Sequence, residues 1–236
     1  MQIIQDLTLD ERKRCSYFAE RERRYTYFLA YQLSKSEFDY YLQSGWRKFG
    51  LCFFKPSCEH CRRCQPLRVK VRDFKPSKSQ RRVLRSNSDL EMKVQRLVFR
   101  EDVYKLYLEH SKRFENNDIS DRDQFLKAFI WQSVPGFQSL YYLNEQLVAA
   151  GFLDVSTSGL SSVYFVFDPA YSKRSLGHFG AMMEMKLALK LGKKYYYLGY
   201  WIEENNSMNY KNRFEPFELL DWKTGEWLSQ EKDNAP

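Results

Sequence analysis

The chain has 236 residues, 43% of them hydrophobic, which is enough for one large domain or for two smaller units that share a core. Its 38 basic and 30 acidic residues leave a formal net charge of +8, and this balance favours a polyanionic partner. The first residues lack the charged and apolar regions of a signal peptide, and no uncharged apolar run approaches the roughly 18 residues of a membrane-spanning helix. We therefore expect a cytoplasmic protein without a membrane partner.

The N-terminal part predicts two strands around one helix. Residues 1–24 are charged and predict no regular structure. Residues 25–33 are rich in aromatic side chains and predict a strand, and a serine just after them would cap a helix that ends at Gly45. Residues 46–54 alternate well enough for a second strand.

Residues 55–85 concentrate the positive charge of the chain. They include eleven basic and two acidic residues, a surplus of nine, so the rest of the chain is close to neutral. Three prolines interrupt this segment and argue against a long basic helix. Residues 66–74 alternate apolar and basic side chains, which predicts a half-buried strand whose basic outer face would contact phosphates. A solvated basic loop is the alternative interpretation.

Three cysteines within this segment follow the spacing Cys58-x2-Cys61-x2-Cys64. This spacing is typical of metal ligands, and a closed zinc site would need a fourth ligand, for which Cys15 is the best candidate. The next candidates are Cys52 and His60. An iron–sulfur cluster would use the same ligands, and three reduced thiols that pack a tight loop are the alternative. We expect any such metal to organise the basic loop rather than to react.

The middle of the chain predicts a strand over residues 90–98 and amphipathic helices over residues 101–114 and 121–131. Three further strands follow, and the first two form a hairpin around residues 144–146. These strands cover residues 139–143, 147–155 and 162–167. A helix over residues 175–191 and a last strand over residues 195–200 complete the pattern.

This order predicts an α+β fold whose mixed sheet contains an antiparallel meander and a helix crossover. It is similar to the acyl-transferase fold of the acetyl-CoA-dependent N-acetyltransferases, which hold a pyrophosphate on a glycine-rich loop at a helix N-terminus. In the matching loop of this chain, Phe179 occupies a position that should be Gly or Ala. We expect its ring to obstruct a pyrophosphate, which counts against acyl-CoA as the donor.

A longer resemblance runs in order from about Cys15 to Leu220. The segments that carry it are Cys15-Ser16-Tyr17, the cysteine run, residues 74–82, Val163-Tyr164-Phe165 with Asp168-Pro169, Arg174-Ser175-Leu176-Gly177, and residues 195–202, 208–214 and 216–220. As a set they resemble the aminoacyl-tRNA–protein transferases, and most closely the short bacterial branch, the aspartate/glutamate leucyltransferases. The resemblance implies an enzyme with an acyl-transferase-like fold. It would move an amino acid from its tRNA to the N-terminal α-amine of a protein that begins with Asp or Glu, creating an N-degron.

We expect a monomer with two regions. Residues 1–100 would carry the cysteine cluster and the tRNA-binding segment, and residues 101–236 would form the catalytic acyl-transferase-like region. The conversion of an ester to an amide is downhill, so the chemistry needs no cofactor. Positioning the two reacting ends could supply on the order of 7–11 kcal/mol of the lowering of the barrier.

Several basic residues are candidates for holding the tRNA, with solubility as their alternative role. The candidates along the basic segment are Lys75, Lys78, Gln80, Arg81, Arg82 and Arg85. Lys173 and the run Arg174-Ser175-Leu176-Gly177, at the mouth of the later helix, would receive the terminal adenosine. A guanidinium would suit the acidic side chain of the acceptor. Arg81, Arg82 and Arg213 are the candidates for that role.

The transfer also needs a group that accepts the proton of the amine or polarises the ester. Asp168 is a candidate base or amine anchor, with a turn residue before Pro169 as its alternative role. Tyr164, Tyr200 and Tyr210 could donate to the developing oxyanion, although ordinary packing is the alternative for each. His178 could titrate usefully at the helix mouth.

The likeness to the bacterial branch favours leucine as the donor amino acid, and arginine is the main rival. An aliphatic donor would need an apolar pocket, whereas arginine would need a carboxylate or carbonyl cluster, and Glu184, Glu203 and Glu204 leave the second possibility open. Two other functions stay open. One is a metal-organised RNA-binding module without catalysis, and the other is an acetyl-CoA-dependent N-acyltransferase.

Overall fold

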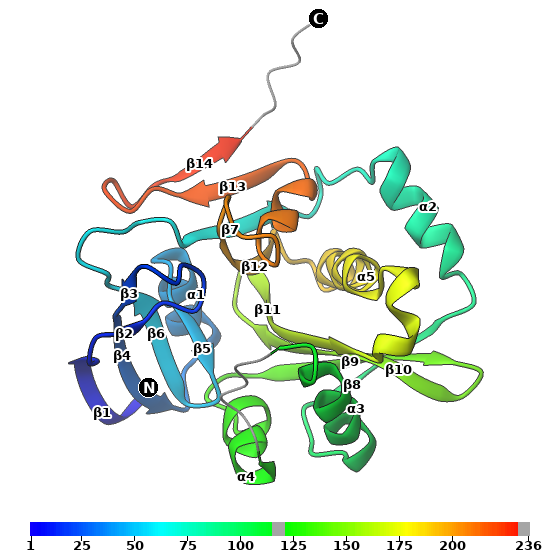
Figure 1. The fold of residues 1–236 in the computed structure, drawn as a ribbon, viewed down its shortest axis with the longest axis horizontal. Helices are drawn as coiled ribbons and strands as arrows, with labels where there is room; N and C mark the ends of the chain where they lie inside the picture. Colours follow the sequence, from blue (N-terminus) through cyan, green and yellow to red (C-terminus); the bar gives the residue numbers. More distant parts are fainter. Residues whose placement is uncertain (115–120, 231–236) are drawn as a thin grey trace, which may run out of the picture.

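The computed structural model describes residues 1–114 and 121–230, and two sheets organise them (Figure 1). The smaller sheet has the strand order β1 (Gln2–Leu9), β4 (Tyr25–Tyr31), β6 (Cys52–Pro56) and β5 (Arg47–Phe49). The larger sheet has the order β14 (Trp227–Gln230), β13 (Phe217–Leu220), β7 (Gln65–Lys70), β12 (Tyr195–Trp201), β11 (Gly159–Phe167), β10 (Gln146–Val155), β9 (Gly136–Leu143) and β8 (Glu91–Arg96). The chain is therefore an α+β protein with a large mixed sheet.

The N-terminal sheet contains more strands than the sequence predicts. Residues 1–24 form β1 and the short ribbon of β2 (Lys13–Arg14) and β3 (Glu22–Arg23), so the prediction of no regular structure there was wrong. Residues 46–54 form the hairpin of β5 and β6 rather than one strand. The chain turns at Gly50, where φ is +53° and a Cβ would lie 1.8 Å from the carbonyl oxygen of Lys127, so only glycine fits.

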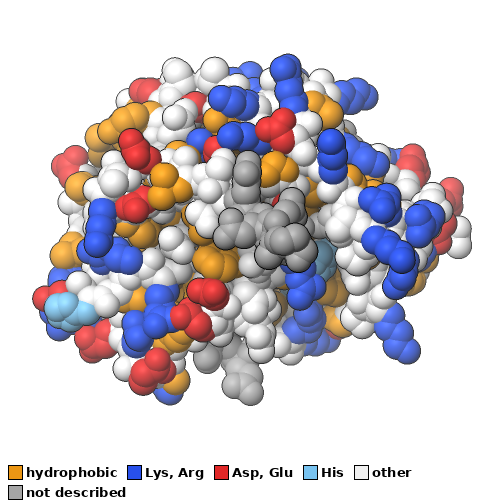
Figure 2. All heavy atoms as spheres, turned by 90° about the horizontal axis from the view of Figure 1, so that it is seen from above, with side chains coloured by type: hydrophobic (Ala, Val, Ile, Leu, Met, Phe, Trp, Pro, Cys, Tyr) orange, Lys and Arg blue, Asp and Glu red, His pale blue; other side chains and the backbone are white. Residues whose placement is uncertain are grey.

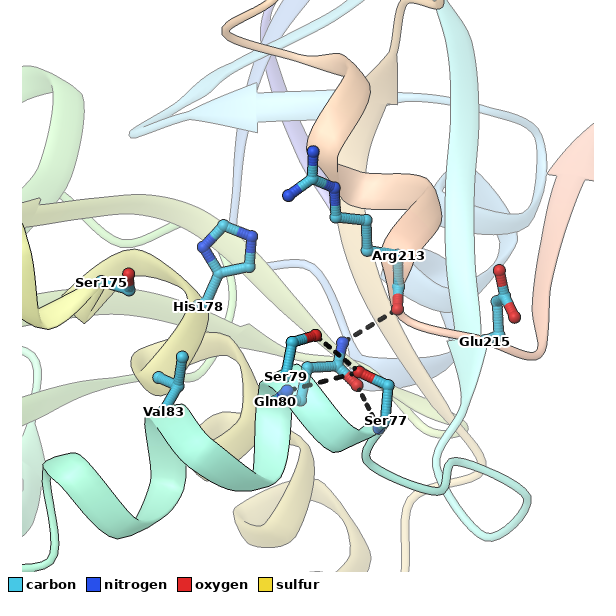
Figure 3. A pocket seen from close by; sticks show the side chains of 8 residues that line it. All are labelled: Ser77, Ser79, Gln80, Val83, Ser175, His178, Arg213 and Glu215. Carbon is cyan, nitrogen blue, oxygen red and sulfur yellow. Dashed lines mark hydrogen bonds between the residues drawn. The ribbon is translucent and has the colours of Figure 1, made fainter.

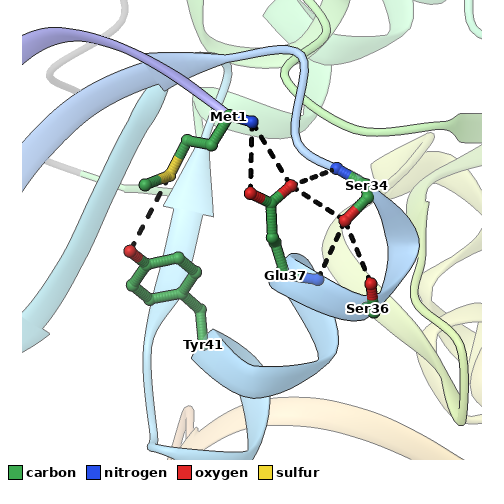
Figure 4. A network of polar contacts seen from close by, with 5 residues as sticks. All are labelled: Met1, Ser34, Ser36, Glu37 and Tyr41. Atoms are coloured by element: carbon green, nitrogen blue, oxygen red, sulfur yellow. Dashed lines mark hydrogen bonds and ion pairs between the residues drawn. The ribbon is translucent and has the colours of Figure 1, made fainter.

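The predicted helix after β4 is α1 (Lys35–Gln43), and a capping box starts it (Figure 4). Ser34 accepts a hydrogen bond from the backbone N–H of Glu37, whose carboxylate accepts one from the N–H of Ser34. The same carboxylate pairs with the amino group of Met1 at 3.1 Å, and Tyr41 donates to the Met1 sulfur. These contacts join the start of β1 to α1.

The larger sheet confirms the predicted meander and crossover. β9, β10 and β11 are antiparallel, and α5 (Leu176–Lys190) returns the chain so that β12 lies parallel to β11. β10 is buried along almost its whole length because both of its faces are covered. Phe152 packs beneath α3 (Glu101–Ser111), while Leu153 packs beneath α5.

Helix α3 and the helical segment over residues 122–130 lie on the face opposite α5 (Figure 1). The predicted helix over residues 121–131 consists of α4 (Arg122–Phe125) followed by a π-helical turn (Leu126–Ile130), and Asp121 caps it. None of the helices in the described part of the chain is long and apolar enough to cross a membrane.

The basic segment differs from the prediction in two ways. It includes a nine-residue helix, α2 (Lys78–Ser86), which Ser77 and Gln80 start with a second capping box. β7 has no basic outer face, because Arg68 is only 6% exposed and its Nε lies 2.6 Å from the Glu218 carboxylate. The β13–β14 hairpin, which the sequence did not predict, covers this side of β7. The alternation of β7 therefore does not create a phosphate-binding face at Arg68.

β7 and β8 lie before residue 100, yet both belong to the larger sheet. The change from one sheet to the other falls in the loop between β6 and β7, which contains the cysteine run. The expected region of residues 1–100 therefore contributes strands to both sheets.

Candidate functional site

The parallel strands β11 and β12 separate partway along the sheet. They pair from Gly159 and Tyr195 as far as Ser161 and Tyr197. The guanidinium of Arg47, from the N-terminal sheet, then donates to Ser161 Oγ at 2.9 Å and to the carbonyl oxygen of Ser162. β12 has a register shift against β7 at the same place. The separation opens the middle of the sheet to side chains from both faces.

On the α5 face, a cavity of about 500 Å³ lies between α2, α5 and the 3₁₀ helix η3 (Asn209–Arg213) (Figure 3). Its lining residues are Ser77, Ser79, Gln80, Val83, Ser175, His178, Arg213 and Glu215. Gln80 Nε2 donates to the Arg213 carbonyl at 2.8 Å, and Asn87 Nδ2 donates to the Arg174 carbonyl at 2.9 Å. These two amides tie α2 to both other walls, and we call this space the α2–α5 cavity.

His178 and Arg213 point toward one another in this cavity (Figure 3). The imidazole lies 5.2 Å from the Tyr210 ring and 5.9 Å from the Phe214 ring, between centroids. Burial lowers the pKa of His178, and the guanidinium of Arg213 lowers it further. His178 is therefore a neutral imidazole at pH 7, next to a fixed cation.

The structure brings three of the predicted substrate- and tRNA-binding residues to the lining of this cavity and places others on α2 beside it. Gln80, Ser175 and Arg213 line it, and α2 forms one of its walls. The cations on α2 and just before it are exposed, and Lys and Arg side chains gather at the side of the molecule where α2 lies (Figure 2). These cations are Lys75, Lys78, Arg81, Arg82 and Arg85. The cationic surface and the mouth of α5 are thus on the same side of the molecule.

Other residues at the N-terminus of α5 make contacts that hold the fold together or point into the core. Arg174 donates to Asp89 at 2.6 and 2.7 Å and to the carbonyl of Ser86, so its guanidinium joins the end of α2 to α5. Leu176 is buried, whereas Lys173 is exposed and Gly177 has open space beside it. Phe179 points into the core against Tyr141, so the expectation that its ring obstructs the helix mouth was wrong.

The four residues predicted for catalysis lie in different places. Asp168 accepts a hydrogen bond from the N–H of Ala170 at 2.9 Å and caps the 3₁₀ helix η2 (Pro169–Arg174). Tyr164 stacks on Phe129 in the core beneath α3. Tyr200 donates to the Gly45 carbonyl at 3.0 Å. Only Tyr210, beside His178, contacts a residue that lines the α2–α5 cavity.

The four cysteines proposed as metal ligands come together around Cys64. Burial, together with the neighbouring Cys15, Cys58 and Cys61, raises the pKa of the Cys64 thiol to about 12. Four thiols are a donor set that zinc or an iron–sulfur cluster accepts. Within the described residues, however, no three metal-binding side chains have the geometry to hold an ion. The thiols also lie at the opposite end of β7 from α2, so a metal there would not organise the basic helix.

Sequence reasoning missed two cations near the separated strands. Lys211 is 8% exposed, and its Nζ donates to the Tyr200 carbonyl at 2.6 Å. Burial lowers the pKa of Lys211 to about 7, and the neighbouring Arg47 also lowers it. The run from Met208 to Phe214 contained a signal for Lys211, whereas no local pattern marks Arg47.

Glu184, on α5, is fully buried, and the sequence suggested it only as a residue that could bind the side chain of an arginine donor. It accepts hydrogen bonds from Ser139 at 2.7 Å and from Tyr196. Burial raises the pKa of its carboxyl to about 7, although the hydroxyls of Tyr196, Ser139 and Ser162 act in the other direction.

Comparison with known proteins gives one consistent result. The family model "Arginine-tRNA-protein transferase, N terminus" matches residues 13–82, and "Arginine-tRNA-protein transferase, C terminus" matches residues 100–221. An aspartate/glutamate leucyltransferase of Marinobacter nauticus is 34% identical over 224 residues, 93% of each chain. One of Helicobacter hepaticus is 30% identical over 217 residues, 89% of this chain and 90% of that one.

Among solved structures, the crystal structure of FemX is similar in fold. The TM-score is 0.51 at 13% identity, and the match covers 78% of this chain and 65% of that one.

Proposed function

The chain belongs to the arginine-tRNA-protein transferase family, and we propose that it transfers leucine from leucyl-tRNA to the N-terminal α-amine of proteins that begin with Asp or Glu. Two relatives that match about nine-tenths of the chain carry the name aspartate/glutamate leucyltransferase. The product would carry a new N-terminal residue that acts as an N-degron.

We assign the described strands β9–β12 and helix α5 to an acyl-transferase fold of the N-acetyltransferase type. The separation of β11 from β12 after Ser161 supports this assignment, because it opens the sheet beside the N-terminus of α5. The amides at such a terminus favour anions. The likeness to FemX agrees at the level of the fold.

The α2–α5 cavity is our candidate for the 3′ end of the tRNA. The observation that carries this assignment is the position of α2, whose exposed cations flank a cavity of about 500 Å³ at the mouth of α5. The cations would contact phosphates, and the cavity would hold the terminal adenosine. Its lining supplies serine hydroxyls and a side-chain amide for hydrogen bonds, and His178 for stacking.

Three acids could have bound the side chain of an arginine donor, but their contacts in the structure favour leucine as the donor. Glu184 is buried and accepts hydrogen bonds from Ser139 and Tyr196. Glu204 pairs with Arg63, and Glu203 is exposed. The oxygens of Glu184 are thus already used by hydroxyl donors, and the other two acids are paired or exposed.

In the reaction, the nitrogen of the neutral α-amine attacks the ester carbonyl, the new C–N bond forms and the C–O bond to the ribose breaks. The ribose hydroxyl gains a proton and the amine loses one. The neutral imidazole of His178 can accept the amine proton, and Tyr210 beside it is the best placed of the predicted oxyanion donors. The roles predicted for Asp168, Tyr164 and Tyr200 stay predictions.

We also propose that the protein is a monomer in the cytoplasm, where its five free cysteines stay reduced. A zinc ion or an iron–sulfur cluster bound by Cys15, Cys58, Cys61 and Cys64 would crosslink the loop between the two sheets and stabilise it. It would take no part in the transfer.

The test uses purified protein, leucyl-tRNA or arginyl-tRNA, and a peptide that begins with Asp. We expect RNase-sensitive transfer of leucine. Binding of tRNA without a product from either donor would favour the RNA-binding module, and thermal stabilisation by CoA would favour the N-acyltransferase. Either result would reject the proposed function.

A further inference from the structure

Among the described residues, Lys48, Arg68, Arg47 and Lys211 are buried or half-buried cations that differ in their partners. Lys48 Nζ lies 3.0 Å from the carboxylate of Asp154, and Arg68 Nε lies 2.6 Å from that of Glu218. Arg47 and Lys211 have no carboxylate within ion-pair distance among the described residues. Buried charges are normally paired, so these two cations require an explanation.

Their contacts are all neutral. The guanidinium of Arg47 donates to a hydroxyl and a carbonyl of β11, and the ammonium of Lys211 lies against the carbonyl of Tyr200 and, at 3.1 Å, the sulfur of Met208. The two cations lie at neighbouring residues of β12, because a Cβ on Gly199 would lie 3.6 Å from the Arg47 guanidinium while Lys211 contacts the Tyr200 carbonyl. Arg47 also lowers the pKa of Lys211. Asp154 raises the pKa of Arg47 from a distance, but the Asp154 carboxylate forms its ion pair with Lys48. Two like charges held together out of water are costly unless an anion joins them.

Hydroxyl and thiol groups surround the pair. The Tyr200 ring lies 6.5 Å from the Phe54 ring, which lies 5.5 Å from the Tyr25 ring, between centroids. Arg47, Tyr25, Cys64 and Tyr17 each act on the pKa of Tyr200. Tyr17 belongs to the Cys15-Ser16-Tyr17 motif, to which the proposed transfer gives no role. We call Arg47, Lys211, Tyr17, Tyr25, Tyr200 and Cys64 the junction cluster, because they lie where the N-terminal sheet, the cysteine loop and β12 meet. Arg47, Tyr17 and Tyr25 are half-buried, so part of the cluster is open to solvent.

The junction cluster and the α2–α5 cavity share one element, η3. Arg213 of η3 lines the cavity, and Tyr210 packs against His178, which also lines it. Lys211, between them in sequence, contacts β12 at the Tyr200 carbonyl instead, next to Gly199, where Arg47 of the N-terminal sheet lies. A ligand in each site would therefore approach the separated strands β11 and β12 from its own side.

We propose that the junction cluster binds the side-chain carboxylate of the acceptor's N-terminal Asp or Glu, with Arg47 and Lys211 as its two cations. This inference rests on the proposed function and refines it, since the sequence offered only Arg81, Arg82 or Arg213 for this role. A carboxylate fits better than RNA, because Lys211 is only 8% exposed and the exposed cations of α2 already suit phosphates. A guanidinium offers a carboxylate two parallel donors, and phenol hydroxyls can supply more.

The test compares peptides that begin with Asp and with Asn, which differ in charge but hardly in shape. We expect Lys211→Met and Arg47→Gln to reduce the Asp-over-Asn selectivity in kcat/KM by roughly 30-fold or more, as removal of one buried charge partner does. Most of the change should be in KM for the Asp peptide. The KM for leucyl-tRNA should not change, and Lys211→Arg should restore selectivity.

Lys193→Met is the matched control. The Nζ of Lys193 also contacts only carbonyls among the described residues, those of Ser156 and Thr157 at 2.7 and 3.1 Å, but Lys193 lies at the opposite end of β12 from η3. It should leave the selectivity unchanged. A structural role of Lys211 would lower transfer to both peptides equally, and that result would overturn the proposal.

Equilibrium binding of the two peptides, without tRNA, separates this proposal from the proposed function. Tighter binding of the Asp peptide by the wild type, lost in Lys211→Met, would support the proposal even if no leucine is transferred. Equal binding of both peptides by the wild type would overturn it. Selectivity that survives both Lys211→Met and Arg47→Gln but falls in Arg213→Gln would overturn it as well and would place the acceptor in the α2–α5 cavity.

Discussion

The two regions on either side of the separated strands β11 and β12 hold positive charge in different ways. The cations of α2 beside the α2–α5 cavity are exposed and lie on one short helix, whereas those of the junction cluster are buried or half-buried and come from two distant parts of the chain. Exposed cations attract any polyanion and are screened by salt. Enclosed cations without a partner reject most ligands and select a small anion. An extended RNA and a single acidic residue therefore need different binding surfaces.

The largest expected effect contrasts a paired buried cation with an unpaired one. We expect Arg68→Met to lower the free energy of unfolding by about 3 kcal/mol, because the buried Glu218 carboxylate then keeps only Lys70 as an ion-pair partner. Lys211→Met should leave that free energy unchanged or raise it by up to about 2 kcal/mol. Urea unfolding without substrates measures both. A large loss of stability in Lys211→Met would show that the junction cluster is a structural element.

The second prediction concerns Glu184, a buried carboxyl without a cation. Its pKa is raised to about 7, so the folded protein holds a proton that the unfolded chain releases above pH 4.5. This stabilising effect is complete below pH 4.5 and is lost as the pH rises through 7. Glu184→Gln should therefore become more stable relative to the wild type, by about 3 kcal/mol, between pH 4.5 and pH 8.

Unfolding of both proteins across this pH range measures the difference. The exposed Glu109→Gln is the control and should show no such trend. If the difference in free energy of unfolding between Glu184→Gln and the wild type stayed constant with pH, the assignment of a proton to the Glu184 carboxyl would be contradicted.

The third prediction addresses the exposed side of the comparison. Replacing Lys78, Arg81, Arg82 and Arg85 together by Gln should lower kcat/KM for leucyl-tRNA by about 10²-fold and reduce the slope of log affinity against log salt by about 3. The Asp-over-Asn selectivity should stay the same. An unchanged salt slope would mean that the tRNA lies elsewhere on the protein.

The smallest effect is expected at Arg213, which lines the α2–α5 cavity but does not belong to the junction cluster. Arg213→Gln should raise KM for leucyl-tRNA by roughly tenfold, because it removes one charge-assisted contact to the donor. It should also raise the pKa of His178 toward its ordinary value, because Arg213 lowers that pKa. Titration of the His178 ring by NMR checks this shift.

Local patterns were sufficient for the elements that pack through one regular face. The meander of β9–β11, the capped helix α1 and the crossover helix α5 follow from alternation, caps and helical spacing, and all are present. The failures have a common physical cause. β1 and the β13–β14 hairpin are stabilised by pairing with distant strands, and Arg68 is buried because that hairpin covers it.

The candidate site was predictable only where its residues are close in sequence. The run Arg174-Ser175-Leu176-Gly177 marked the mouth of α5, and the density of cations marked α2. The junction cluster joins Arg47 to Lys211, and only the folding of the N-terminal sheet against β11 and β12 brings them together. No spacing within the chain could indicate that contact.

One experiment tests most directly whether the two regions serve two substrates. Single-turnover transfer of labelled leucine to Asp and Asn peptides is followed at two salt concentrations, in the wild type, Lys211→Met and the fourfold α2 variant. The account predicts that Lys211→Met loses only the preference for Asp, while the α2 variant loses only affinity for the charged tRNA and its sensitivity to salt. If either variant loses both properties together, a single site serves both substrates and the account is contradicted.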